Sequence, residues 1–140
     1  MSLLIVDASV AVKWFFEEEH AGAALSVRDP RHERHAPDFF LVEMDSVLAK
    51  FIRRGVLTLA DAEQARLVLR ETRIQLHPSL PLLDSAWTIA NQTRAGIYDS
   101  LYLALAVLLK GKVVTADRKL LRSVARTPFA KQVVWVEDVA

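Results

Sequence analysis

Cysteine is absent from this chain of 140 residues, which excludes disulfide bonds and thiolate metal sites. Its absence suits a reducing compartment, and we expect a cytoplasmic protein. Apolar runs of about 18 residues, long enough to cross a membrane, are also missing. The first residues carry no basic segment and Asp7 interrupts their apolar run, so no signal peptide is expected. Glycine and proline are scarce, with 4 and 5 copies, which favours an ordered fold.

A strong excess of either charge is missing too. The formal net charge is +1, so the whole molecule is not an obvious binder of nucleic acid. The segment from Lys110 to Lys131 differs, because it holds seven basic residues against Asp117 alone. This segment is either a surface that faces phosphates or an ordinary solvated helix face.

Short apolar runs alternate with longer helical patterns along the chain, whose length suits one domain spanning residues 1–140. Strands are expected at Leu3–Val6, His35–Ala36, Ile74–His77, Val113–Thr115 and Val133–Val136. Helices are expected at Ala8–Phe16, Ala21–Val27, Pro37–Arg54, Thr58–Glu71, Leu80–Arg94, Asp99–Leu109 and Arg118–Ala125. Residues 28–35 read as a polar loop. The alternation predicts an α/β fold, a parallel sheet with helices on both faces.

Three aspartates stand where the strands and helices meet. Asp7 follows the first strand, Asp117 follows the fourth, and Asp99 begins the helix that leads into the fourth. Ligands of parallel sheets bind outside the carboxyl ends of the strands, so these carboxylates are candidates to converge. Each of them could instead cap a helix, a role worth about 1 kcal/mol over alanine.

The charge of these side chains weighs against capping as their whole purpose, because Ser, Thr and Asn cap about as well. Two carboxylates about 4 Å apart repel by roughly 4 kcal/mol at an effective dielectric near 20. Helix dipoles return only about 0.3–1 kcal/mol each. Convergence therefore implies a cation, and oxygen ligands without cysteine favour Mg²⁺ or Mn²⁺.

Glu43 falls at the edge of the apolar stripe of its expected helix, where the pattern alone predicts a solvated residue. Asp45 lies beyond that stripe and is expected to be structural or exposed. The helix after Asp99 is different, since residues 101–109 carry no charge and predict burial on nearly every side.

Four segments, LLIVDASVAVKWF, APDFFLVEMDSVLAKFIRRG, GIYDSLYLALAV and VVTADRKLL, resemble in order and spacing the successive blocks of PIN-domain proteins. They are most similar to the VapC-type ribonuclease toxins of toxin–antitoxin pairs. The resemblance implies a three-layer sandwich with five parallel strands and a Mg²⁺- or Mn²⁺-dependent endoribonuclease. It matches the acidic site residues, both catalytic and metal-binding, to Asp7, Glu43, Asp99 and Asp117.

The same resemblance suggests supporting and partner roles. Ser9 and Thr115 stand where the family carries hydroxyl residues that hold a carboxylate; their alternative is turn and cap bonding. Ser46 replaces an asparagine common in relatives, which puts its supporting contact in doubt. Arg118, Lys119 and Arg122 are possible RNA contacts. A homodimer and a small VapB-like antitoxin are the expected partners.

The remaining polar and aromatic residues predict no second site. His20, His32, His35 and His77 lack a third ligand or a helical frame and are expected at the surface. Trp14, Phe15 and Phe16 are clustered and either fill the core or form a partner surface. Trp87 and Trp135 are expected in the core.

Two other functions remain open on the sequence. One is a phosphohydrolase with an aspartate nucleophile, although the D-x-D pattern usual there is missing after Asp7. The other is a non-catalytic module that binds RNA or protein, in which the acids serve only as caps.

Overall fold

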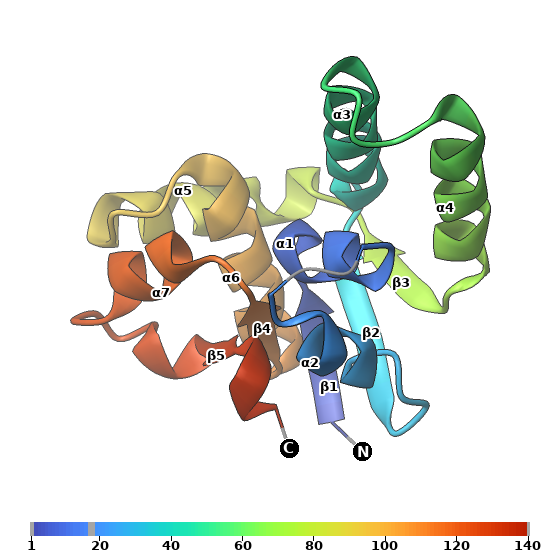
Figure 1. Ribbon diagram of the computed structural model, residues 1–140. Helices are drawn as coiled ribbons and strands as arrows, with labels where there is room; N and C mark the ends of the chain where they lie inside the picture. Colours follow the sequence, from blue (N-terminus) through green and yellow to red (C-terminus); the bar gives the residue numbers. More distant parts are fainter. Residues whose placement is uncertain (1, 17–18, 140) are drawn as a thin grey trace.

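Five parallel strands form the centre of the fold, in the spatial order β3-β2-β1-β4-β5 (Figure 1). The computed structural model describes residues 2–16 and 19–139. The strands are β1 Ser2–Val6, β2 His32–Pro37, β3 Ile74–His77, β4 Lys112–Thr115 and β5 Val133–Trp135. The central strand β1 pairs Ile5 with His35 on one side and with Val113 on the other. The expected five-stranded parallel sheet is confirmed.

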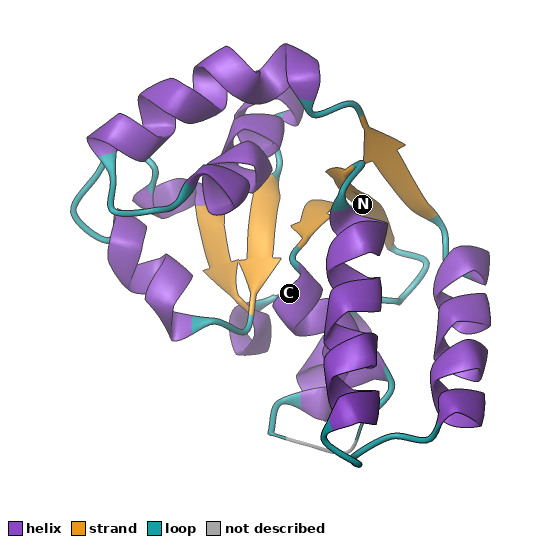
Figure 2. Cartoon of the chain, turned by 90° about the horizontal axis from the view of Figure 1, so that it is seen from above, coloured by secondary structure: helices purple, strands orange, loops and turns teal. Residues whose placement is uncertain are grey.

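Helices cover both faces of this sheet, as expected for parallel strands. The α-helices are α1 Ala8–Ala11, α2 Ala21–Ser26, α3 Phe40–Arg53, α4 Leu59–Glu71, α5 Leu83–Gln92, α6 Ile97–Leu109 and α7 Arg118–Val124. Short 3₁₀ turns are η1 Val12–Trp14, η2 Leu80–Leu82, η3 Ala130–Gln132 and η4 Val136–Asp138. Helices α5 and α6 lie over one face, while α1 and α2 lie over the other (Figure 2).

Helix α6 forms the centre of the apolar core, because residues 100–106 are all buried. It contacts β1, β2 and β4, so its apolar surface is covered by the sheet and by α5. A second, smaller cluster lies between α3 and α4 and contains Leu48, Ala62 and Ala65. Asp45 on α3 and Arg66 on α4 tie this helix pair together through hydrogen bonds of 2.9 and 3.0 Å. Burial of α6 agrees with the sequence analysis for residues 101–106, but Val107 and Leu108 near its end are 47% and 63% exposed. The structural role of Asp45 also agrees.

Capping residues explain where α4 begins and where α3 ends. Thr58 caps α4 by accepting a hydrogen bond from the Asp61 N–H at 3.1 Å. Gly55 follows α3 with a φ of 71°, a left-handed conformation that glycine adopts without steric cost. In the described part of the chain, no helix is long and apolar enough to cross a membrane.

Strand β2 is longer and more polar than predicted, which corrects the loop expected at residues 28–35. His32 and His35 were expected at the surface but are only 5% and 3% exposed. The His35 ring bonds on both sides, with Nε2 2.6 Å from Glu33 Oε1 and Nδ1 2.8 Å from His77 Nε2. A buried polar side chain is tolerated when its hydrogen bonds are satisfied, and the partner on β3 is invisible in the local pattern.

The tryptophans are distributed differently from the prediction. Trp87 was expected in the core but is 67% exposed, because it lies on the outer side of α5. Trp135 is half-buried and packs against the core. Trp14 is buried, and its Nε1 donates to the Ala24 carbonyl at 2.7 Å. The choice left open for Trp14 is thereby decided in favour of core filling.

We expect Gly111→Ala to destabilise the fold. A Cβ at Gly111 would meet the Leu3 side chain and lie 2.8 Å from the Leu3 carbonyl oxygen. Such overpacking costs about 1–3 kcal/mol, so thermal unfolding should show a lower Tm. Gly22→Ala is the matched control, because that position on α2 has open space and should gain up to about 1 kcal/mol. An unchanged Tm for Gly111→Ala would contradict this close approach.

Candidate active site

Two neighbouring strands deliver two aspartates to the same edge of the sheet. Asp7 directly follows β1, and Asp117 follows β4 by two residues. Strands β1 and β4 pair in parallel, and the Asp7 N–H continues their ladder by donating to the Val114 carbonyl at 3.3 Å. Asp99 lies in the first turn of α6 and Glu43 in the first turn of α3. These four residues are called the acidic site below.

Asp7 is buried and held by two hydroxyl groups. It is 7% exposed, and its Oδ2 accepts hydrogen bonds from Ser9 Oγ at 2.7 Å and Thr115 Oγ1 at 2.8 Å. Ser9 Oγ also accepts from the Ala116 N–H at 3.1 Å, which fixes the turn after β4. The supporting contacts predicted for Ser9 and Thr115 are therefore present. Ser46 is exposed and contributes no such bond within residues 2–16 and 19–139.

Burial raises the pKa of the Asp7 carboxyl, and the negative charge of Asp117 adds to this rise. The hydrogen bonds from Ser9 and Thr115 oppose it by favouring the charged form. Asp7 stands at the start of α1, but its side chain makes no capping hydrogen bond of normal geometry. Capping alone therefore does not explain this carboxylate.

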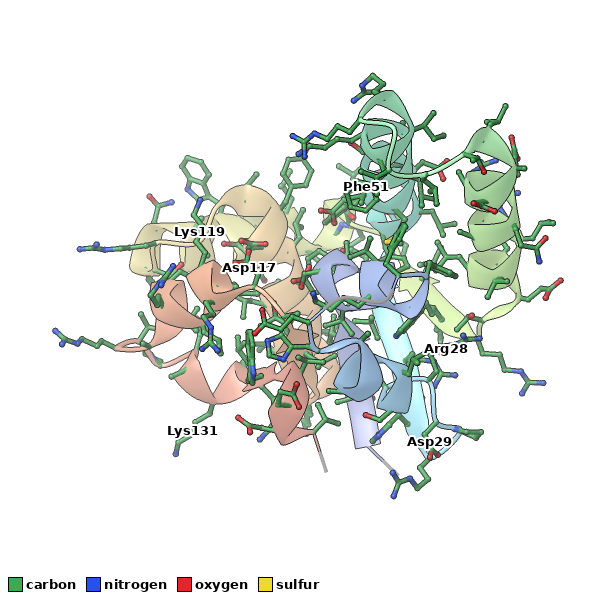
Figure 3. The ribbon with its side chains drawn as sticks, in the orientation of Figure 1. Arg28, Asp29, Phe51, Asp117, Lys119 and Lys131 are labelled. Atoms are coloured by element: carbon green, nitrogen blue, oxygen red, sulfur yellow. The ribbon has the colours of Figure 1, made fainter. Side chains whose placement is uncertain are left out.

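Asp117 does cap a helix. Its Oδ1 accepts from the Lys119 N–H at 2.9 Å, and its own N–H donates to Thr115 Oγ1 at 3.0 Å. Asp117 and Lys119 both lie near the amino end of α7 (Figure 3). The capping interpretation thus holds for Asp117, whose second oxygen remains available for another interaction.

Asp99 lies inside the first turn of α6, and Gly96 occupies the cap position. Burial, together with the charges of Asp7 and Asp117, raises the pKa of Asp99 to about 6. The positive charge of Lys119 partly opposes this rise, which places that ammonium group within electrostatic reach of Asp99.

Tyr102 is a residue of this site that the sequence analysis missed. It is 1% exposed, and its hydroxyl donates to Glu43 Oε1 at 2.7 Å. Burial keeps the pKa of Tyr102 far above its usual value, so the phenol stays protonated and donates. A polar group buried in an apolar helix needs a partner, and Tyr102 stands three residues after Asp99. A polar residue on the same face of the helix as Asp99 was therefore the signal in the sequence that could have identified Tyr102 as part of the site.

Glu43 is half-buried, in contrast to the solvated position that its helical pattern predicted. Burial raises the pKa of its carboxyl, the charges of Asp7 and Asp99 add to the rise, and the Tyr102 hydroxyl opposes it. The charges of Asp7 and Asp99 thus reach every other carboxylate of the acidic site.

The donors fit a hard cation by their chemistry, because all are carboxylate oxygens. The carboxylates are spaced more widely than the ligands of a single bound ion. In the described part of the chain, no three Asp, Glu or His side chains lie close enough to bind one ion as they stand. Mg²⁺ is usually held by one or two carboxylates together with waters and substrate phosphates, so a preformed cage of three is not required.

The predicted RNA contacts divide into three environments. The Arg118 guanidinium stacks over the Trp135 ring, with its carbon 4.5 Å from the ring centroid. Lys119 lies in the first turn of α7, within electrostatic reach of Asp99. Arg122 points elsewhere and lines a pocket between α5 and α7.

The fold and site define a class of protein: a parallel α/β protein with an acidic site at the carboxyl edge of its sheet. This chain belongs to the PIN-domain family, whose pattern matches residues 4–126. It is similar to Ribonuclease VapC3 of Pyrobaculum aerophilum, with 31% identity over 119 residues that cover 84% of this chain and 91% of that protein.

Solved structures share the fold. PAE2754 from Pyrobaculum aerophilum superposes with a TM-score of 0.71 at 22% identity, over 97% of this chain and 92% of that one. A chain of a toxin–antitoxin complex from Klebsiella pneumoniae gives 0.65 at 15% identity, over 99% and 100%. The architecture predicted from the sequence is therefore confirmed.

The raised pKa of Asp99 predicts how stability depends on pH in the presence of chelator. The folded-state pKa of about 6 exceeds the ordinary 3.8, so this group favours folding below pH 4 and loses that contribution as the pH rises through 6. We expect Asp99→Asn to be more stable than the wild type at pH 7, by on the order of 1–2 kcal/mol after allowing for solvent screening. The difference should shrink toward pH 4. Denaturant unfolding at several pH values measures it, and a mutant less stable than the wild type at pH 7 would contradict the repulsion.

Proposed function

We propose that this chain is a single PIN-like domain acting as a metal-dependent endoribonuclease, the toxin of a type II toxin–antitoxin pair. The observation that carries the proposal is the acidic site itself. Four carboxylates interact at one sheet edge, and one of them is buried at electrostatic cost and held by Ser9 and Thr115. The similarity to Ribonuclease VapC3 supports the same activity.

In this proposal Asp7, Glu43, Asp99 and Asp117 would hold Mg²⁺ or Mn²⁺ together with waters and the substrate phosphate. Such an ion would neutralise charge on the scissile phosphate and lower the pKa of a bound water. Asp7 provides a fixed oxygen, because two hydroxyls hold its carboxylate in one orientation. Tyr102 holds Glu43 in the same way.

The reaction we propose is attack of water oxygen on phosphorus, with cleavage of the bond to the 3′-oxygen. The attacking water gives a proton to a carboxylate, and the 3′-oxygen leaves with a proton from solvent water, so the products are a 5′-phosphate and a 3′-hydroxyl. Asp99 and Glu43 are the two candidates for accepting it.

Basic residues beside the site suit a polyanionic substrate. Lys119 lies within electrostatic reach of Asp99, and the Trp135 ring supports the guanidinium of Arg118. Phosphate contacts of this kind bind RNA without reading its sequence, which is read from unpaired bases. Binding in this way would take place in the cytoplasm, where we expect the protein to act.

The two rival functions lack comparable support. In a caps-only module Asp7 would cap α1, and it makes no such hydrogen bond. A phosphohydrolase with an aspartate nucleophile usually carries the D-x-D pattern, and Ala8 and Ser9 follow Asp7 instead.

We expect Asp7→Asn and Asp99→Asn to lower RNA cleavage by orders of magnitude, because each removes a ligand charge while keeping the side-chain shape. Cleavage of single-stranded RNA with Mg²⁺ or Mn²⁺, followed by mapping of the RNA ends, measures the effect. Asp45→Asn is the control, since Asp45 pairs with Arg66 on the far side of α3, and its activity should stay near wild type. Cleavage that persists in chelator, or an Asp99→Asn variant of full activity, would refute the metal site.

A small antitoxin is the partner we propose, since a structural neighbour belongs to a toxin–antitoxin complex. It would place a basic side chain against the acidic site.

A homodimer is proposed as well. A row of exposed apolar residues suits such an interface: Leu80, Leu83 and Trp87, which are 83%, 43% and 67% exposed.

We expect the protein encoded by an adjacent small open reading frame to bind this chain and stop cleavage. Sedimentation should show a dimer, and Trp87→Ala should shift it toward monomer by removing a large apolar contact. Lys50→Ala, a change at a charged exposed position, serves as the control. A monomeric wild type would refute the dimer, and a bound antitoxin without inhibition would refute the blocking contact.

A further inference from the structure

Three arginines surround a pocket of about 510 Å³ between α5 and α7. Arg94 follows α5, Arg122 lies in the last turn of α7, and Arg126 follows that helix. The two helices lie next to each other at one end of the molecule (Figure 1). Arg94 also joins them through its backbone N–H, which donates to the Ser123 carbonyl at 3.3 Å. We call this site the arginine pocket.

The arginine pocket contains positive charge without a balancing acid. Its other lining residues are amides, hydroxyls and one alanine: Asn91, Gln92, Thr93, Ser123, Ala125 and Thr127. The three hydroxyls donate to backbone carbonyls of their own helices at 2.7–2.9 Å. Among residues 2–16 and 19–139, none of the three guanidiniums makes a hydrogen bond or an ion pair. Their donors therefore remain available to an anion.

The helix dipole explains part of this arrangement. Basic residues near a helix carboxyl end gain about 0.3–1 kcal/mol each. The dipole stabilises each arginine taken singly. Repulsion among three positive charges around one pocket opposes this stabilisation. Guanidinium groups bind phosphate through paired N–H donors, which makes a phosphate group the ligand that fits best.

Helix α7 connects the acidic site to the arginine pocket. Asp117 of the acidic site caps the amino end of α7. Arg122 lies in the last turn of the helix and Arg126 follows it, and both line the pocket. Seven residues of helix span about 10 Å, the length of roughly three nucleotides of a stacked strand.

We propose that the arginine pocket binds the phosphodiester backbone of the RNA substrate, a few nucleotides away from the bond that the acidic site cuts. This inference rests on the proposed ribonuclease function and adds a second anchoring point to it. The pocket would favour substrates long enough to reach both sites, and its contacts would carry no base specificity.

The test compares the wild type with Arg94→Gln/Arg122→Gln/Arg126→Gln. Binding of a labelled oligouridylate of about 20 nucleotides, longer than the ~4–16 of typical single-strand sites, is measured in chelator across a salt series. For single strands, the slope of log affinity against log salt concentration decreases by about 0.7 for each phosphate contact that is lost. At 0.1 M salt this corresponds to a loss of about 5-fold in affinity for one contact and on the order of 100-fold for three. An oligomer of about 4 nucleotides, too short for both sites, should lose much less.

The matched control is Arg53→Gln/Arg54→Gln/Arg70→Gln, which removes the same charge from exposed positions on α3 and α4. It should bind the long oligomer like the wild type, and thermal melting checks that both variants are folded. Equal loss in both triple variants would reduce the effect to net charge and overturn the inference. So would unchanged binding by the pocket variant, even if the wild type cleaves RNA. A wild type that neither binds nor cleaves RNA would instead refute the ribonuclease proposal, and this inference with it.

Discussion

The hydrogen bonds between Asp7 and the hydroxyls of Ser9 and Thr115 are the interaction on which the site depends. They join the end of β1 to the end of β4, so the strand register and the carboxylate position are set together. Burial alone would favour a neutral Asp7, and the two hydroxyls offset part of that preference. A slip of one residue in the β1–β4 pairing would turn Thr115 to the other face of the sheet and leave Asp7 without this support.

Helix α6 makes a comparable contribution from the core. Its buried surface gives it a fixed position against the sheet, so Asp99 in its first turn is kept close to Asp7 despite their repulsion. One turn further along the same helix, Tyr102 reaches Glu43 on α3. Helix α6 thus positions two carboxylates: Asp99, which it carries itself, and Glu43, which is held by the Tyr102 hydroxyl.

Much of this structure could be predicted from the sequence, because apolar runs and strand-end aspartates are local signals. The strand after Leu3, the helix after Asp99 and the convergence of Asp7 with Asp117 all follow from such patterns. Strand β2 could not be found in this way, since its buried His35 is bonded by a partner, His77, 42 positions along the chain. The half-buried position of Glu43 was missed for the same reason. The pattern of one helix cannot show that Tyr102 of another helix will contact it.

Helices α3 and α4 have their own small core and their own ion pair, which makes them a partly separate lever attached to the sheet. Glu43 belongs to α3, whereas Asp7, Asp99 and Asp117 belong to the sheet and to the helices around it. Phe40 and Met44, on either side of Glu43 along α3, are fully buried in the main core. Any tilt of α3 would therefore have to disturb this packing as well as the Glu43–Tyr102 hydrogen bond, so the same core that supports Asp99 also fixes the position of Glu43.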